Sequence, residues 1–311
     1  ENYYSLIDRK RISNRKKIWK VMRITGLLTL GLFLLLAVRI FVNLRQLAED
    51  QAMMIKTDEE LIGTHFYVPR DGKDDVDVNL YMLEDETVHP VVFNIHGGAF
   101  IAGDADALDT QSDRISKSWG VQVVSINYSL AVNGVSIEDG TQEIVDTVLF
   151  FREHATEYHI ASDQIYIMGY SAGGYHAMAS VLKLKEINVD VAGQILCYSF
   201  LRDTLNRYEK MTAEQQSDLA PALFVIAEGD PIGEGSLQYE EALRSNSIST
   251  QILTYRGALH GFIEENNPEY ETLHSKASKS PEQEQMARDA ETKIGLWLTG
   301  IGSEGVKNDP I

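Results

Sequence analysis

The sequence predicts an α/β protein: a mostly parallel sheet of about eight strands with helices on both faces, preceded by one membrane-spanning helix. Short runs rich in β-branched residues alternate with helical patterns over about 200 residues, as in chains built from crossover units. Several of these runs are apolar at four or more consecutive positions, which is typical of strands covered on both faces. A long apolar run after a basic segment predicts the membrane span.

The apolar run Ile24–Val42 carries one charge, Arg39, and at 1.5 Å per residue it is about 28 Å long, close to the hydrocarbon thickness of a bilayer. Eight Lys or Arg residues precede it, so the positive-inside rule predicts a single-pass cell-membrane protein with a cytoplasmic N-terminus and an extracytoplasmic main domain. A cleaved signal peptide is the alternative, but no small-x-small site follows the run. The predicted segments are a basic cytoplasmic segment (1–23), a transmembrane signal-anchor helix (24–44), a linker (45–62) and the main α/β domain (63–311).

The net charge of the chain is −18, although residues 1–45 carry ten Lys or Arg against two acidic residues. The main domain is therefore strongly acidic, and nucleic acid is not expected as a partner, because phosphate binding needs a basic surface. Cys197 is the one cysteine in the sequence, which excludes an intramolecular disulfide. The histidines and carboxylates show no paired metal-ligand spacing, so we expect no metal and no other cofactor.

The expected elements alternate along the main domain, and a charged turn at Arg70–Asp75 separates the first two strands. The last helix begins at Pro281, with Ser280 as its N-cap. The expected strands are Val78–Leu83, Pro90–Ile95, Val121–Tyr128, Gln164–Gly169, Val191–Ser199, Ala222–Gly229 and Thr250–Gly257, and the expected helices before the last are Thr141–Tyr158, Ser171–Glu186 and Leu237–Ser247.

A Gly-x-Ser-x-Gly turn, Gly169 to Gly173, joins a predicted strand to a predicted helix. Ligands of open α/β sheets bind outside the carboxyl ends of the strands, which is where this turn places Ser171. Glycines at both flanking positions let the strand and the helix approach closely, and the serine is held in a strained backbone conformation. Ser171 is therefore the candidate nucleophile.

A second glycine pair, Gly97 and Gly98 after His96, also follows a strand. Acyl transfer develops negative charge on a carbonyl oxygen, and prearranged backbone N–H donors stabilise that charge by about 3 kcal/mol each. We expect the amides of Gly97, Gly98 and Ala172 to form an oxyanion hole. His96 is expected to orient its own loop.

A serine nucleophile needs a base and an orienting acid. Asp230 and His260 each follow a predicted strand, and the order Ser, Asp, His is that of α/β-hydrolase triads. Glu228 and Asp203 are rival acids. The other histidines considered are His154, His159 and His176, which fall on predicted helices, and His274, which follows no strand.

The motifs "HGGAF", "NYSLA", "GYSAGG", "EGDPI" and "LHGF" occur in that order, and together they resemble the hormone-sensitive-lipase-like and carboxylesterase branch of the α/β hydrolases over roughly residues 65–300. The resemblance implies that Ser171 is the nucleophile, His260 the general base and acid, and Asp230 its partner. Three features depart from that branch. Ala99 replaces a common glycine, Tyr128–Asn133 reads "YSLAVN", and the N-terminal cap helices look absent.

The segment Ser199–Pro221 is a short polar insertion between late strands, where many hydrolases carry a lid. A small lid favours short acyl groups or a carbohydrate-linked acetyl ester. We therefore expect a serine esterase of short-chain or acetyl esters on a bacterial surface. A peptidase or amidase with the same triad, and a non-catalytic binding protein, are the alternatives.

Overall fold

The computed structural model describes residues 55–201, 205–270 and 279–300, together with part of the stretch between residues 22 and 49. The chain divides into two compact units, Glu1–Glu49 and Asp50–Ile311. The described residues of the first unit are helical. None of the helices within the described residues has the length and apolar character of a membrane span. The predicted span 24–44 falls partly outside the described residues, which omit 24, 26–28, 30, 34 and 44.

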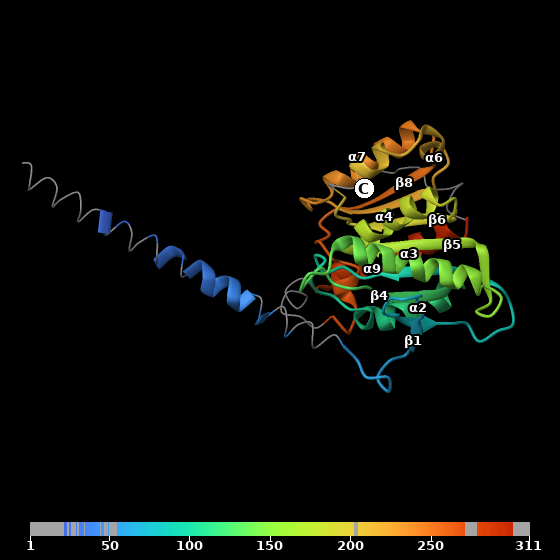
Figure 1. Cartoon of the computed structure of the whole chain (residues 1–311), viewed down its shortest axis with the longest axis horizontal. Helices are drawn as coiled ribbons and strands as arrows, with labels where there is room; N and C mark the ends of the chain where they lie inside the picture. Colours follow the sequence, from blue (N-terminus) through green and yellow to red (C-terminus); the bar gives the residue numbers. More distant parts are fainter. Residues whose placement is uncertain are drawn as a thin grey trace, which may run out of the picture. The chain divides into compact units, whose positions relative to one another are not determined.

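The second unit is built on one eight-stranded sheet with the order β1-β2-β4-β3-β5-β6-β7-β8 (Figure 1). Strands β3 to β8 are parallel, and β1 and β2 run antiparallel at one edge. The predicted mostly parallel sheet of about eight strands is confirmed. The strands are β1 (Thr64–Val68), β2 (Val76–Tyr81), β3 (His89–Ile95), β4 (Gln122–Asn127), β5 (Ile160–Tyr170), β6 (Gly193–Cys197), β7 (Ala222–Ala227) and β8 (Thr250–Tyr255).

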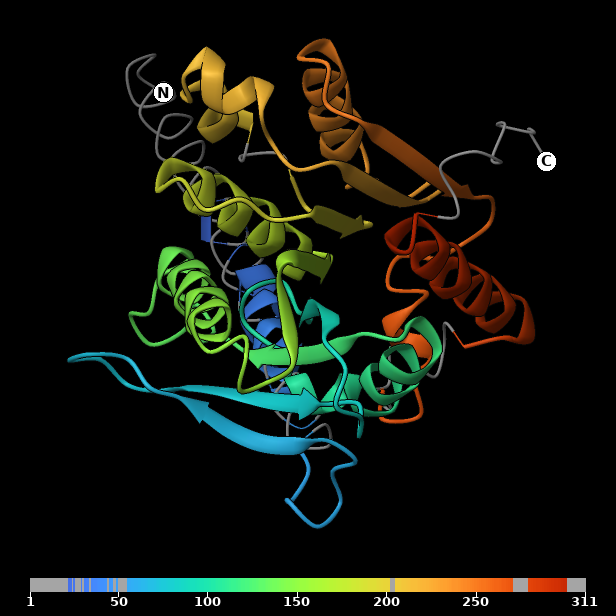
Figure 2. The ribbon, with the colours of Figure 1, turned by 90° about the vertical axis from the view of Figure 1, so that its right-hand side faces the viewer.

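Helices cover both faces of this sheet, and Figure 2 shows α3 and α4 on one side with α2 and α9 on the other. Each face buries its own apolar cluster, because the parallel strands carry apolar side chains at successive positions. The helices are α2 (Asp109–Trp119), α3 (Ile137–Glu153), α4 (Ala172–Glu186), α5 (Leu205–Glu209), α6 (Ala213–Ser217), α7 (Glu234–Ser245) and α9 (Pro281–Leu298), with short 3-10 turns η1 (Ala105–Leu108) and η2 (Glu264–Asn266).

Local capping explains where two of the helices begin. Ser280 accepts a hydrogen bond from the Gln283 amide at the start of α9, as predicted. Helix α3 begins at Ile137, four residues before the expected start, because Ser136 and Asp139 form a capping box. Helix α2 was not expected, since its sequence "DTQSDRISKSW" is mostly polar.

The end of the predicted linker, from residue 56 to residue 62, is part of the second unit and is bonded to its helix α2. The Lys56 ammonium lies 2.7 Å from the buried Asp109 carboxylate and 3.1 Å from that of Glu269. The Asp109 carboxylate also accepts the Ile62 and Gly63 amides. These contacts hold the segment that leads into β1 against the first residue of α2.

Candidate active site

Ser171 occupies the turn between β5 and α4, with φ 51° and ψ −114°. A side chain at Gly169 would place its Cβ 2.1 Å from the Gly173 carbonyl oxygen, and one at Gly173 would place it 2.3 Å from that of Ile95. Both positions therefore require glycine for close backbone approach. The turn stores backbone strain at the serine, which is a feature of functional sites.

The structure brings Ser171, His260 and Asp230 into one hydrogen-bonded row. His260 Nε2 lies 2.9 Å from Ser171 Oγ, and His260 Nδ1 lies 2.6 Å from Asp230 Oδ2. Asp230 follows β7, and its other carboxylate oxygen accepts the Ile232 amide at 3.1 Å. The Asp230 side chain is 3% exposed and that of His260 is 38% exposed. A buried carboxylate can thus fix the imidazole while the reacting side stays open to a substrate.

The rival residues lie elsewhere. Glu228 is half exposed and pairs with Arg256 at 3.3 Å, while Asp203 and His274 lie outside the described residues. His176 is buried in α4, where it contacts Thr141 Oγ1 at 2.9 Å, and burial lowers its pKa to about 3. His154 and His159 do not lie inside a helix as expected: His154 caps the end of α3 and His159 lies in the turn that follows.

His96 and the glycines after it form a tight loop at the end of β3. His96 Nδ1 donates to the Gly97 carbonyl oxygen at 2.7 Å, and its ring stacks on Tyr128 with centroids 4.3 Å apart. Burial lowers the pKa of His96 to about 4, so it acts as a neutral support for its loop, as expected. Gly98 has φ 122°, and its carbonyl oxygen accepts the amides of residues 101 and 102.

The structure treats the three expected oxyanion donors differently. The Ala172 amide lies in the first turn of α4, where N–H groups have no partner within the helix. The Gly97 amide instead donates to Glu264 Oε1 at 2.7 Å. The prediction that the Gly97 amide is an oxyanion donor is therefore wrong for this structure, because its hydrogen is already bonded to a carboxyl oxygen.

Glu264 is a site residue that the sequence analysis missed. It lies in η2, four residues after His260, and it is 3% exposed. Burial raises its pKa to about 8. The sequence signal was an acidic pair directly after the apolar residues of "HGFIEE", a context that does not suit a surface carboxylate.

An aromatic cluster lies near the serine. The Phe200 amide donates to the Ser171 carbonyl oxygen at 3.0 Å, and the Phe100 ring packs edge-on against Tyr175 and Phe200, with centroids 5.2 and 6.2 Å away. Each of these three aromatic residues is partly exposed. They form an aromatic cluster next to the turn that carries Ser171.

The described part of the predicted lid is short and anchored. Residues 205–217 form α5 and α6, and residues 202–204 lie outside the described part of the chain. Arg207 pairs with Glu138 of α3 at 2.6 Å, and Tyr208 packs edge-on against Tyr239 of α7. These contacts hold the insertion on the face covered by α3 and α7.

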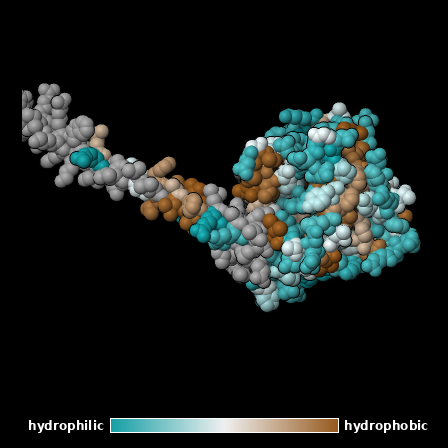
Figure 3. Space-filling model, turned by 60° about the horizontal axis from the view of Figure 1, so that its bottom comes forward, coloured by the Kyte–Doolittle hydropathy of each residue, from teal (hydrophilic) through white to brown (hydrophobic). Residues whose placement is uncertain are grey.

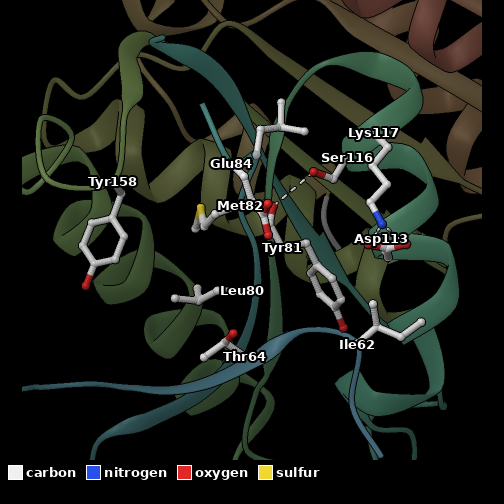
Figure 4. Close-up of a pocket in the computed structure, with 11 residues that line it drawn as sticks. Ile62, Thr64, Leu80, Tyr81, Met82, Glu84, Asp113, Ser116, Lys117 and Tyr158 are labelled. Atoms are coloured by element: carbon white, nitrogen blue, oxygen red, sulfur yellow. Dashed lines mark hydrogen bonds and ion pairs between the residues drawn. The ribbon is translucent and has the colours of Figure 1, made fainter. Parts of the chain in front are cut away.

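A separate groove lies at the other end of the sheet (Figure 4). Residues from the end of β2 line it with Asp113, Ser116 and Lys117 of α2. Because β2 is antiparallel to β4, its last residue Tyr81 pairs with Val123 near the start of β4. The groove is therefore distinct from the site at the carboxyl ends of the parallel strands. Within the described residues, no group of three or more His, Cys, Asp or Glu side chains could hold a metal ion.

Comparison with known proteins supports the fold described above. A family model for the alpha/beta hydrolase fold matches residues 92–217, which include the glycine loop and the Ser171 turn. The chain has the alpha/beta hydrolase fold and is a hydrolase. It is 25% identical over 227 residues to the acetyl esterases of Salmonella schwarzengrund and Salmonella typhi, covering 61% of the chain and 70% of each relative.

Solved structures share the fold of this hydrolase. An arylesterase aligns with a TM-score of 0.64 and 20% identity, over 82% of this chain and 89% of that one. A hyperthermophilic esterase from the archaeon Pyrobaculum calidifontis aligns with a TM-score of 0.65 and 20% identity, over 84% and 93% of the two chains. At this identity the likeness concerns the arrangement of the sheet and helices.

Proposed function

We propose that this hydrolase is an esterase that cleaves short-chain acyl or acetyl esters through an acyl-enzyme on Ser171. The observation that carries the proposal is the hydrogen-bonded row from Ser171 Oγ through His260 to the buried Asp230. His260 Nε2 takes the serine proton as Oγ attacks the ester carbonyl carbon, and then gives that proton to the departing alcohol. Water then cleaves the acyl-serine bond by the same proton transfers.

The negative oxygen formed in each attack needs prearranged donors. The amides of Gly98 and Ala172 are the proposed donors, and the N-terminus of α4 adds its positive partial charge. The substrate class rests on two supports. The curated relatives are named acetyl esterases, and the aromatic cluster of Phe100, Tyr175 and Phe200 offers apolar surface next to the turn that carries Ser171.

The experiment compares wild type with Ser171→Ala on p-nitrophenyl esters of 2 to 12 carbons and tests labelling by a fluorophosphonate. We expect turnover and labelling in wild type alone, with acetate and butyrate preferred. Labelling that persists in Ser171→Ala would show that another residue is the nucleophile, and a preference beyond 8 carbons would contradict the substrate class. Faster cleavage of matched anilides than of esters would favour an amidase. A wild type that neither labels nor turns over would favour a binding protein.

We further propose that residues 24–44 anchor the protein in the cell membrane, with the hydrolase domain outside. The support is the charge asymmetry around the run and the exposure of its described apolar side chains, including Leu35 and Leu36. Figure 3 shows hydrophobic residues exposed on the first unit. Leu35→Lys with Leu36→Lys should shift the full chain from the carbonate-resistant membrane fraction to the supernatant. Ile187→Lys, an exposed position of the second unit, is the control, and equal retention of both variants would refute the anchor.

A further inference from the structure

We propose that Glu264 is a positioning residue of this active site, whose carboxyl group joins the histidine loop (residues 256–263) to the glycine loop (residues 96–104) and thereby orients the Gly98 amide. The inference rests on the proposed function, since it assigns Gly98 as an oxyanion donor. Glu264 itself touches neither Ser171 Oγ nor His260 by a hydrogen bond that the structure shows. Its effect is transmitted through the backbone of Gly97.

The contact spans the carboxyl edge of the sheet. The glycine loop follows β3 and the histidine loop follows β8, and β5, β6 and β7 lie between these strands. The bond from the Gly97 amide to Glu264 Oε1 is 2.7 Å long and buried. Each loop follows a different strand, and these two strands are not neighbours in the sheet. The hydrogen bond between Glu264 and Gly97 therefore sets the distance between the two loops directly.

The peptide group that carries the Gly98 N–H is held from both sides. Its carbonyl oxygen belongs to Gly97 and accepts a hydrogen bond from His96 Nδ1 at 2.7 Å. The preceding peptide is fixed through the Gly97 amide by Glu264. In a trans peptide the N–H and C=O groups point in opposite directions, so fixing the Gly97 backbone at both groups determines where the Gly98 N–H points.

The carboxyl group also lies close to the serine. A Cβ placed on Gly97 would lie 2.9 and 3.0 Å from the two Glu264 carboxyl oxygens and 3.3 Å from Ser171 Cβ. A negative charge on Glu264 would therefore oppose the developing oxyanion, whereas a neutral carboxyl can accept the Gly97 N–H without that penalty. Both the geometry and the charge state matter for the proposed role.

The surroundings of Glu264 favour the neutral form. Burial is the largest cause that raises its pKa to about 8, and the neighbouring Glu265 adds to it, whereas the Gly97 amide and the Tyr198 hydroxyl act in the opposite direction. The other titratable groups that face Glu264 lie at the ends of β4, β5 and β6 and after η2, and they are Tyr128, Tyr170, Cys197 and Tyr270. Activity is therefore expected to fall as the pH rises through about 8.

The test compares Glu264→Gln and Glu264→Leu in the full chain, with p-nitrophenyl acetate as substrate. The glutamine oxygen can still accept the Gly97 N–H, so kcat at pH 7 should stay within about threefold of wild type. Leucine removes the acceptor and should lower kcat roughly 10- to 100-fold with little change in KM, part of the loss seen when one oxyanion donor is removed. Wild-type kcat should fall between pH 7.5 and 9, while that of Glu264→Gln stays level.

The matched control is Glu291→Gln, another buried glutamate, which pairs with Arg114 and Arg288. It should lower the melting temperature and leave kcat unchanged. If the leucine variant does not fold, Glu264→Asp replaces it, because the shorter side chain cannot reach Gly97 in place and should lower kcat in the same way.

Three results would overturn the proposal: a Glu264→Leu or Glu264→Asp variant with lowered melting temperature but wild-type kcat, a Glu264→Gln variant as impaired as Glu264→Leu, or superimposable pH profiles of wild type and Glu264→Gln. Failure of the proposed function is separately visible, since Ser171→Ala would then keep its esterase activity. The Glu264 variants are compared by the part of p-nitrophenyl acetate hydrolysis that is lost in Ser171→Ala.

Discussion

Replacing Asp230 by asparagine should change which ring nitrogen of His260 carries the hydrogen, while the shape of the site is kept. In the structure Asp230 Oδ2 lies 2.6 Å from His260 Nδ1, and Oδ1 accepts the Ile232 amide at 3.1 Å. Asparagine would keep its oxygen on the Ile232 amide and turn its NH2 group toward Nδ1. The imidazole must then accept at Nδ1 and carry its hydrogen on Nε2, so it presents a donor, and no longer a base, to Ser171.

The expected loss in kcat at neutral pH is about 10,000-fold, as for the same change in a serine protease triad, which corresponds to about 5.5 kcal/mol of lost transition-state stabilisation at 1.36 kcal/mol per decade. The assay is hydrolysis of p-nitrophenyl acetate together with the rate of fluorophosphonate labelling. Both should fall in parallel, because both need a deprotonated serine oxygen. The melting temperature should change little, since the substitution conserves volume and the bond to Ile232.

Glu228→Gln is the matched control, because it removes a carboxylate two residues away that pairs with Arg256 on the surface. Its activity should stay within about twofold of wild type, as exposed ion pairs contribute little. A folded Asp230→Asn variant with more than one tenth of wild-type kcat would refute the reasoning. Equal losses in both variants would show that general acidity of this loop, and not the contact with His260, is what matters.

Three further predictions concern stability. Gly173→Ala should lower the free energy of unfolding by several kcal/mol in urea denaturation, because its Cβ would lie 2.3 Å from a backbone oxygen, whereas Gly233→Ala, with 3.4 Å to the nearest atom, should be tolerated. Burial raises the pKa of Asp104 to about 6, so its stabilising contribution is complete below pH 3.8 and is lost as the pH rises through 6. Asparagine does not titrate, so the free energy of unfolding of Asp104→Asn, measured relative to wild type, should increase by up to about 3 kcal/mol between pH 4 and pH 7. Lys56→Met should cost about 3 kcal/mol in thermal unfolding, because it leaves the buried Asp109 carboxylate without its ion pair.

Each stability prediction has an outcome that contradicts it. Equal unfolding energies of Gly173→Ala and Gly233→Ala would show that the turn can relax. A difference between Asp104→Asn and wild type that does not vary with pH would show that Asp104 titrates normally. Lys73→Met, which removes an exposed partner of Asp146, should cost less than about 1 kcal/mol, and an equal cost for Lys56→Met would contradict the role of burial.

The sequence predicted the strands better than the helices because the parallel strands are apolar on both faces. Strands such as β7, with all six residues buried, stand out as apolar runs. Helix α2 lacks such a signal: its buried positions include Asp109 and Gln111, whose Oδ2 and Nε2 atoms form hydrogen bonds with distant residues, Lys56 and Glu291. Polar burial of this kind depends on tertiary partners, and a single sequence does not reveal them.

The candidate site likewise contains residues that the sequence predicts and contacts that it does not. Ser171, Asp230 and His260 were predictable because each occupies a strand end, and the topology of a parallel sheet collects strand ends at one edge. The state of the Gly97 amide was not predictable, because its partner Glu264 lies 167 residues away. The glycine pair indicates a tight loop, but which amide remains available depends on that contact.

The glycine loop and the serine turn form one structural unit, and this explains why the chain carries both motifs. A Cβ at Gly173 would meet the carbonyl oxygens of Ile95 and His96 at 2.3 and 2.4 Å, which are the peptide groups that lead directly into Gly97. Any shift of the serine turn therefore moves the loop that presents the Gly98 amide. The nucleophile and the oxyanion donor are thus kept in register by backbone contact between β3 and α4, so a substitution that loosens this contact should impair acyl transfer even when the row from Ser171 to Asp230 stays intact.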